Sequence, residues 1–217
     1  MNTQLLLDNL RAIQDFPVPG VNFRDVSTLF KNPACLSEMS DALYEIYKDK
    51  GITKVVGIES RGFVMASILA HRLGAGMVLA RKPGKLPAKT IAEEFEKEYG
   101  KDVIEIHADA ISSDDVVLLH DDLLATGGTM LAAYHLAQRF HPQRTYINFL
   151  IEITDEGLHG REAFPDGVEV TSLLKIEQIH KLLIIKSVAY CFHAISVASA
   201  TRSKRMRNHS SHNHSFT

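Results

Sequence analysis

Nine consecutive residues combine paired acids, hydroxyls and glycines in an order that suits a phosphorylated sugar. The segment Asp121–Thr129 reads Asp-Asp-Leu-Leu-Ala-Thr-Gly-Gly-Thr and comes shortly after an apolar run, Val116–Leu119. Backbone N–H groups at a helix start, together with threonine hydroxyls, form a cradle for a phosphate dianion, and glycines let the backbone approach it closely. The adjacent carboxylates suit the hydroxyls of a sugar carrying that phosphate. The candidate binding residues are Asp121, Asp122, Ala125, Thr126, Gly127, Gly128 and Thr129.

The same segment also fits an ordinary capped turn, with an N-cap threonine and solvated aspartates. Its position after a predicted buried strand favours a binding site, because ligands of open parallel sheets lie at the carboxyl ends of the strands. It is not a P-loop, since the pattern G-x-x-x-x-G-K-[ST] occurs nowhere in the sequence.

Basic residues follow two other predicted strands. Glu59-Ser60-Arg61-Gly62 opens a predicted helix, so its N–H groups would face an anion that Arg61 could bind in a fork. The alternative is a surface arginine at a helix start, which the helix dipole disfavours. Arg81, Lys82 and Lys85 place three cations in five residues. Such runs are usually solvated, but this one is predicted at the same sheet edge as Arg61 and could neutralise a polyanion.

Hydrophobic periodicity predicts an α/β fold in which a mostly parallel sheet is flanked by helices. Nearly continuous apolar strands alternate with helical patterns, and each chemically interesting segment follows a predicted strand. The predicted strands are Lys54–Ile58, Met77–Ala80, Val103–His107, Val116–Leu119, Tyr146–Ile153 and Val168–Leu174, and the predicted helices are Leu5–Ile13, Leu36–Tyr47, Phe63–Leu73 and Met130–Phe140.

Length and charge indicate one domain with an appendage. The chain has 217 residues and a formal net charge of -2, but residues 177–217 carry +5 and residues 1–176 carry -7. An acidic body argues against nucleic acid as the main partner. Residues 178–200 could form an amphipathic helix, and residues 198–217 read as a disordered basic tail.

The compartment expected from the sequence is the cytoplasm. Two cysteines, Cys35 and Cys191, make no disulfide framework, and the N-terminus lacks the features of a signal peptide. The apolar stretch Leu182–Ala200 is interrupted by Lys186 and His193, so no membrane span is expected.

The segment Asp121–Thr129 resembles the phosphoribosyl-pyrophosphate (PRPP) signature of the type I phosphoribosyltransferase family, and its adenine-specific branch in particular. Other segments match that branch in the expected order and extend the resemblance over residues 3–176. They are Phe16–Asp25, Gly57–Phe63, Arg81–Pro87, and Glu98-Tyr99-Gly100 with Ile104–His107 downstream. The resemblance implies a Rossmann-like fold with an N-terminal base-binding segment and a mobile catalytic loop.

The resemblance also implies an activity, the conversion of adenine and PRPP to AMP and pyrophosphate in purine salvage, with Mg²⁺ bound through PRPP and a homodimer as the assembly. Phe23 would stack on one face of adenine and Leu123 on the other, while backbone groups near Asn22 and Arg24 read the base edge. Glu98 would act as the acid or base, with Tyr99 packing or hydrogen-bonding in the closed state. The pyrophosphate contacts implied are Ser60, Arg61, Arg81, Lys82 and Lys85, with a non-proline cis peptide near Glu59–Ser60.

The sequence leaves the substrate base, the class of function and the role of an acidic segment open. The base could be xanthine, hypoxanthine or guanine, or the chain could be a regulator that senses PRPP or purines. The acidic segment Ile91–Tyr99, which shows no strong apolar face, could be a lid over the substrate or a plain solvated hairpin. His120 is expected to be half-buried and bonded to backbone.

Overall fold

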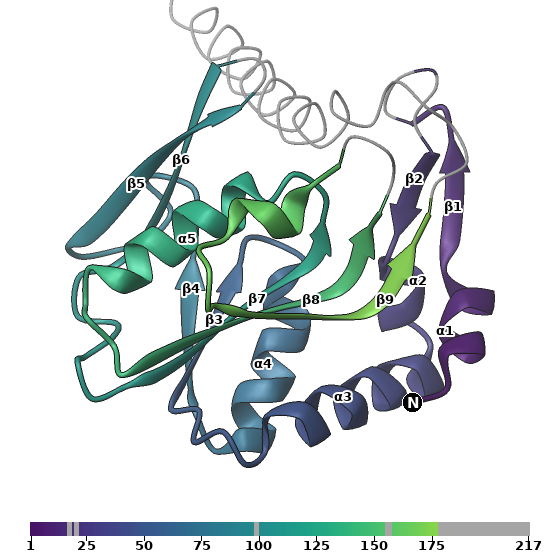
Figure 1. The fold of residues 1–217 in the computed structure, drawn as a ribbon, viewed down its shortest axis with the longest axis horizontal. Helices are drawn as coiled ribbons and strands as arrows, with labels where there is room; N and C mark the ends of the chain where they lie inside the picture. The colour runs from purple at the N-terminus through teal and green to yellow at the C-terminus, as the bar shows by residue number, and fades with distance from the viewer. Residues whose placement is uncertain (17–18, 20–21, 98–99, 155–157, 178–217) are drawn as a thin grey trace, which may run out of the picture.

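A five-stranded parallel β-sheet forms the centre of the protein (Figure 1). The computed structural model describes residues 1–16, 19, 22–97, 100–154 and 158–177. The strand order is β4-β3-β7-β8-β9, and every neighbouring pair is parallel. The strands are β3 (Lys54–Ile58), β4 (Gly76–Ala80), β7 (Val116–Leu124), β8 (Arg144–Ile153) and β9 (Glu169–Ile176). The predicted parallel α/β fold is confirmed.

Helices cover both faces of this sheet (Figure 1). The helices α3 (Pro33–Tyr47) and α4 (Gly62–Leu73) lie on one face, and α5 (Gly128–Gln138) lies on the other. Side chains of a strand alternate between the two faces, so Leu118 packs in the core under α3 and α4, while Leu119 packs in the core under α5. Burial of both faces explains the nearly continuous apolar strands of the sequence.

Strand β7 is longer than the predicted run of four residues. It pairs with β8 as far as Leu124, which lies opposite Glu152. The acids Asp121 and Asp122 therefore lie within the strand and are held by it, where the sequence had suggested that they follow it.

The N-terminal region differs most from the sequence prediction. It comprises α1 (Thr3–Asn9), β1 (Arg11–Gln14), β2 (Asn22–Asp25) and α2 (Ser27–Phe30). The predicted helix to Ile13 is wrong, because Thr28 Oγ1 donates to the Asn9 carbonyl and accepts from the Arg11 N–H. The chain then turns into β1, where Ile13 pairs with Phe23 of β2.

A β-hairpin projects beside α5 (Figure 1). Its strands β5 (Thr90–Lys97) and β6 (Gly100–His107) are antiparallel and in continuous register. A short 3₁₀ turn, η1 (Gly160–Ala163), lies between β8 and β9. Among the described residues no helix is long and apolar enough to cross a membrane. The stretch Leu182–Ala200 and the rest of residues 178–217 lie outside the described residues.

Candidate active site

The phosphate cradle predicted from the sequence is formed where β7 gives way to α5. Gly127 is the N-cap of α5 and has a positive φ of 81°, a conformation that favours glycine. Within the described structure no side chain caps this helix, and its first turn carries no acid. The first N–H groups of a helix have no partner inside the helix, so this uncapped end suits an anion. Thr126 is exposed and Thr129 half-buried at its rim.

The two acids at the end of β7 have different surroundings. Asp122 is buried and forms an ion pair with Arg61. Asp121 is partly buried, and its Oδ1 accepts the N–H of Asp122 at 2.9 Å. Burial, followed by the negative charge of Asp122, raises the pKa of Asp121 well above its ordinary value. Two carboxylates held this closely favour a cation or hydroxyl donors between them.

The segment after β3 lies directly against these acids. A Cβ atom added at Gly62 would come within 2.9 Å of both Asp121 Oδ1 and the His120 carbonyl oxygen. Glycine at position 62 is therefore what lets the start of α4 approach β7 so closely. The peptide between Glu59 and Ser60 is cis, as the resemblance implies, and the Ser60 side chain is exposed.

Arg61 joins three parts of the predicted site. It is the N-cap residue of α4, pairs with Asp122, and has its guanidinium carbon 6.0 Å from the centre of the Phe23 ring. From the sequence, a bound ligand was expected to be the anion that offsets the unfavourable helix dipole at Arg61. The structure shows that a carboxylate of the protein itself supplies that anion.

Glu59 is a hub that the sequence interpretation missed. Its carboxylate accepts from the Arg81 guanidinium at 3.2 Å, from the Lys82 N–H at 3.0 Å and from Lys85 Nζ at 3.4 Å. Burial alone would raise the pKa of Glu59, but the hydrogen bonds from Arg81 and Lys82 and the charge of Lys85 lower it below its ordinary value. The loop after β3 and the cationic loop after β4 are thus tied together.

The cationic loop is also anchored from the hairpin. Glu105 of β6 is buried, and its carboxylate accepts from the Gly84 N–H and the Thr90 hydroxyl, each at 3.0 Å. An acid between Ile104 and Ile106 in a predicted strand is the signal by which the sequence could have shown this role.

The described residues of the acidic segment predicted as a lid or a plain hairpin lie in β5, the first strand of the hairpin, and have an apolar face. Ile91 and Phe95 pack against the core under α5, which corrects the expectation that this segment lacks an apolar face. Arg139, the C-cap residue of α5, pairs with Glu93 and donates to the Ala92 carbonyl at 3.1 Å. Glu98 and Tyr99, the predicted acid or base and its neighbour, lie outside the described residues.

A small cavity connects the hairpin with the other segments. Its lining residues include Glu59, Arg81, Lys82, Phe95 and Thr129. The cationic loop, the start of α5 and the hairpin therefore meet at one place, beside the carboxyl ends of the strands.

The predicted base-binding residues occupy the N-terminal edge of this region. Phe23 is half-buried and makes an edge-to-face contact with Phe16, with ring centres 5.2 Å apart. Arg24 lies beside it in β2, opposite Ala12 of β1. Leu123 is half-buried at the end of β7 and packs on the core under α3 and α4.

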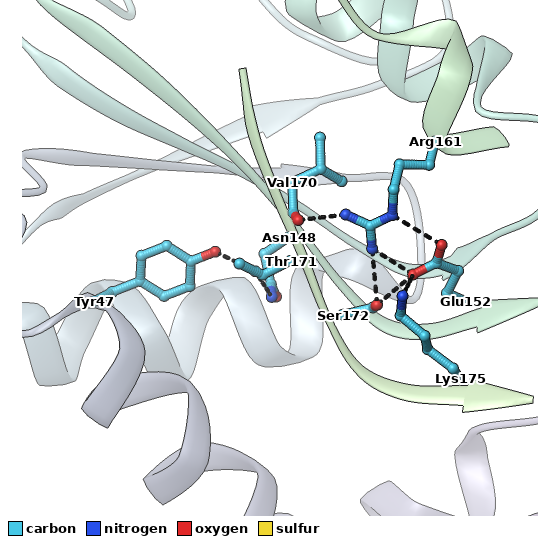
Figure 2. A network of polar contacts seen from close by, with 8 residues as sticks. All are labelled: Tyr47, Asn148, Glu152, Arg161, Val170, Thr171, Ser172 and Lys175. Carbon is cyan, nitrogen blue, oxygen red and sulfur yellow. Dashed lines mark hydrogen bonds and ion pairs between the residues drawn. The ribbon is translucent and has the colours of Figure 1, made fainter. Parts of the chain in front are cut away.

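The expectation for His120 was wrong in both respects. The side chain is fully buried, and its Nδ1 bonds to Asn148 Oδ1 at 2.7 Å in place of a backbone group. Burial lowers the pKa of His120 to about 4. Asn148 continues through Thr171 to the Tyr47 hydroxyl (Figure 2), so this polar chain joins β7, β8, β9 and α3 beneath the site.

Fold and site together define an α/β protein that presents an anion cradle, paired acids and two cation-bearing loops at one edge of a parallel sheet. Residues 25–177 match the family described as the phosphoribosyl transferase domain. The chain belongs to this phosphoribosyltransferase family.

Relatives and solved structures agree on one branch of that family. An adenine phosphoribosyltransferase of Phocaeicola vulgatus is 62% identical over 81% of this chain and 100% of the relative. One of Bacteroides thetaiotaomicron is 57% identical over 81% and 99%. The Giardia lamblia enzyme, solved in complex with 9-deazaadenine, is 41% identical, with a TM-score of 0.76 over 82% of this chain and 99% of that one.

Proposed function

We propose that the protein transfers the 5-phosphoribosyl group of PRPP to adenine and so makes AMP and pyrophosphate. In this reaction the bond from the anomeric carbon to pyrophosphate breaks, pyrophosphate leaves with the electron pair, and a ring nitrogen of adenine forms the new bond. The observation that carries the proposal is the meeting of the cradle before α5, the acid pair of β7 and the cationic loops at one sheet edge. The names of the 62% and 57% identical relatives support adenine as the base.

The cradle and the acid pair are assigned to the phosphorylated ribose. Ala125–Thr129 would bind the 5′-phosphate through N–H groups and threonine hydroxyls. Asp121 and Asp122 would accept hydrogen bonds from the ribose hydroxyls and hold the sugar while positive charge develops at the anomeric carbon.

The loops after β3 and β4 are assigned to pyrophosphate. Arg61, Arg81, Lys82 and Lys85, with Ser60 beside them, would neutralise the charge that develops on the leaving group. Arg61 is bonded to Asp122 and Arg81 to Glu59 in this structure, so these contacts keep two cations in place before the substrate arrives.

The base and the acid–base step are assigned by resemblance. Phe23 and Leu123 would enclose adenine, and backbone groups near Arg24 would read its edge. Glu98 would carry the proton exchanged with the purine ring, and Tyr99 would pack over the closed site.

Magnesium fits this arrangement through oxygens of the substrate. Among the described residues no group of three or more His, Cys, Asp or Glu side chains could hold a metal by itself. Burial and the charge of Asp122 raise the pKa of Asp121, and a dication brought by PRPP would offset that repulsion. Asp121 and Asp122 would face the ion, which when bound neutralises part of the pyrophosphate charge.

Three further properties are proposed: where the transferase domain ends, which assembly the protein forms and where in the cell it works. Residues 1–176 would form the transferase and residues 177–217 an extension, because the Phocaeicola vulgatus relative is matched over 176 residues and its full length. The homodimer is proposed from the resemblance to the family. The free, buried Cys35 accords with a cytoplasmic location.

The test is the release of pyrophosphate from PRPP in the presence of each purine base. Adenine is expected to give release that requires Mg²⁺ and stops with excess EDTA, while hypoxanthine, guanine and xanthine give far less. Release with a 6-oxopurine but not with adenine would reassign the base. No release with any base, together with tight binding of PRPP, would point to a regulator.

Replacing Glu59 by glutamine tests the hub. A neutral amide has one oxygen to accept with and no charge to hold Arg81 and Lys85, so the cationic loop should lose its fixed position. We expect the KM for PRPP to rise about tenfold, equivalent to about 1.4 kcal/mol, with little change in the KM for adenine. Glu45→Gln, which removes an exposed ion pair with Lys48, is the matched control. Unchanged PRPP kinetics in a folded Glu59→Gln protein would show that Glu59 does not position the cationic loop for PRPP.

A further inference from the structure

The turn η1 presses directly against the phosphate cradle. A Cβ atom added at Gly160 would lie 2.1 Å from the Ala125 carbonyl oxygen and 2.9 Å from Leu124 Cδ1. A Cβ added at Gly127 would lie 2.6 Å from the Gly160 carbonyl oxygen. The two backbones are therefore in contact through glycines on both sides, and neither can shift without displacing the other.

Arg161 holds this turn in place (Figure 2). Its guanidinium makes a two-pronged ion pair with Glu152 and donates to the Val170 carbonyl at 2.5 Å and to the Ser172 hydroxyl at 3.2 Å. Ser172 Oγ in turn donates to Glu152 at 2.5 Å, and Lys175 lies 3.9 Å from the same carboxylate. One side chain thus joins the turn to both β8 and β9.

Glu152, the residue that Arg161 binds, lies beside the start of the phosphate cradle. Glu152 is opposite Leu124 in the β7–β8 pairing, and Leu124 is the residue before Ala125. The Glu152 side chain is 8% exposed, and hydrogen bonds from Arg161 hold its pKa below the ordinary value. A two-pronged pair in such a buried place fixes orientation as well as distance.

We infer that Gly160 and Arg161 are positioning residues for the 5′-phosphate. Arg161 fixes the turn, and the turn fixes the Ala125 carbonyl, so that the N–H groups which follow stay directed at the phosphate. Neither residue lies in the sequence segments that resemble the family motifs. The inference rests on the proposed function, because it assigns a buttress to the phosphate subsite of that function.

Two ligands separate this role from general stabilisation. Ribose 5-phosphate reports on the cradle, whereas pyrophosphate reports on the loops after β3 and β4. For Gly160→Ala, calorimetric titration is expected to show ribose 5-phosphate binding at least tenfold weaker and pyrophosphate binding within twofold of wild type. Gly76→Ala is the matched control, because Gly76, like Gly160, does not have a positive φ, and the atoms nearest to an added Cβ belong to the flexible Lys54 side chain, at 3.2 Å or more.

Arg161 is tested by a graded pair of variants. Arg161→Lys keeps the charge near Glu152 and loses the two-pronged geometry, so we expect about threefold weaker ribose 5-phosphate binding. Arg161→Gln should weaken it at least tenfold, again without a matching loss for pyrophosphate. Arg144→Gln is the control, since Arg144 is exposed at the opposite end of β8 and stacks on Tyr146. Circular dichroism confirms folding, and Arg161→Lys serves if Arg161→Gln does not fold.

The binding measurements distinguish the positioning role of Gly160 and Arg161 from a general effect on stability and from a wrong phosphate subsite. Selective loss of ribose 5-phosphate binding supports the buttress. Unchanged binding in folded Gly160→Ala, or equal weakening for both ligands, overturns it while the proposed function stands. A wild-type protein that does not bind ribose 5-phosphate overturns the phosphate subsite, and with it the proposed function, before any variant is considered.

Discussion

Asp121→Asn is expected to raise the melting temperature of the protein while removing nearly all of its transferase activity. The Asp121 carboxylate is held beside that of Asp122, and burial together with this like charge raises its pKa. A group whose pKa is raised on folding stabilises the folded state fully only below its unfolded pKa, here near 3.8, and that stabilisation is lost as the pH rises through the folded value. At neutral pH the carboxylate therefore opposes folding, and an amide should remove this penalty.

The expected gain in melting temperature is about 2–4 °C at pH 7, the shift that about 1 kcal/mol produces in a domain of this size. It should shrink as the pH falls through the folded pKa and approach zero only below the unfolded pKa of about 3.8, where Asp121 is protonated in both states. The amide still accepts the Asp122 N–H but carries no charge to hold the ribose and its metal ion. We expect kcat/KM for PRPP to fall about a hundredfold, equivalent to about 2.7 kcal/mol.

Calorimetric melting at pH 7 and at a series of pH values down to about 3, together with PRPP kinetics, checks both halves of this prediction. Asp114→Asn, at an exposed position before β7, is the control for loss of one negative charge. A variant that melts lower at pH 7, or that keeps wild-type activity, would contradict the assignment of Asp121 as a strained ribose-binding acid.

Arg61→Gln is expected to damage both stability and activity, and a second substitution should separate the two effects. Without Arg61 the buried Asp122 loses its counter-ion. Removing one partner of a fully buried pair costs about 3–5 kcal/mol. Arg61 is 36% exposed, so we expect about 2 kcal/mol, or about 4–8 °C in melting temperature. Loss of a cation at the leaving group should lower kcat about a thousandfold.

The double variant Arg61→Gln with Asp122→Asn removes the unpaired charge. Its melting temperature should return to within about 2 °C of wild type, while its activity stays as low as that of the single variant. Thermal unfolding and single-turnover kinetics are measured for the wild type, for Arg61→Gln, for Asp122→Asn and for the double variant, which together form a double-mutant cycle. Recovery of activity in the double variant would show that Arg61 acts only by neutralising Asp122 and does not touch pyrophosphate.

The parts of the fold that the sequence predicted are those set by local patterns. Continuous apolar runs predicted the strands because both faces of the sheet are buried, and β3 was predicted with its observed bounds. The acids, threonines and glycines of Asp121–Thr129 predicted the cradle because strand, turn and helix start are neighbours in the chain.

The parts that it did not predict depend on contacts between distant segments. Glu59 meets Arg81 and Lys85, and Glu152 meets Arg161, only after the sheet has brought separate loops together. Helix α1 ends early because of Thr28, which lies 19 residues beyond Asn9. No periodicity within either segment carries this information.

A crystal structure of the protein with AMP tests the central assignment most directly. We predict the 5′-phosphate within hydrogen-bond distance of backbone N–H groups in Thr126–Thr129, and the ribose hydroxyls on the carboxylates of Asp121 and Asp122. AMP bound away from this segment, or bound there with its phosphate on the loop of Arg81 and Lys85, would contradict the account.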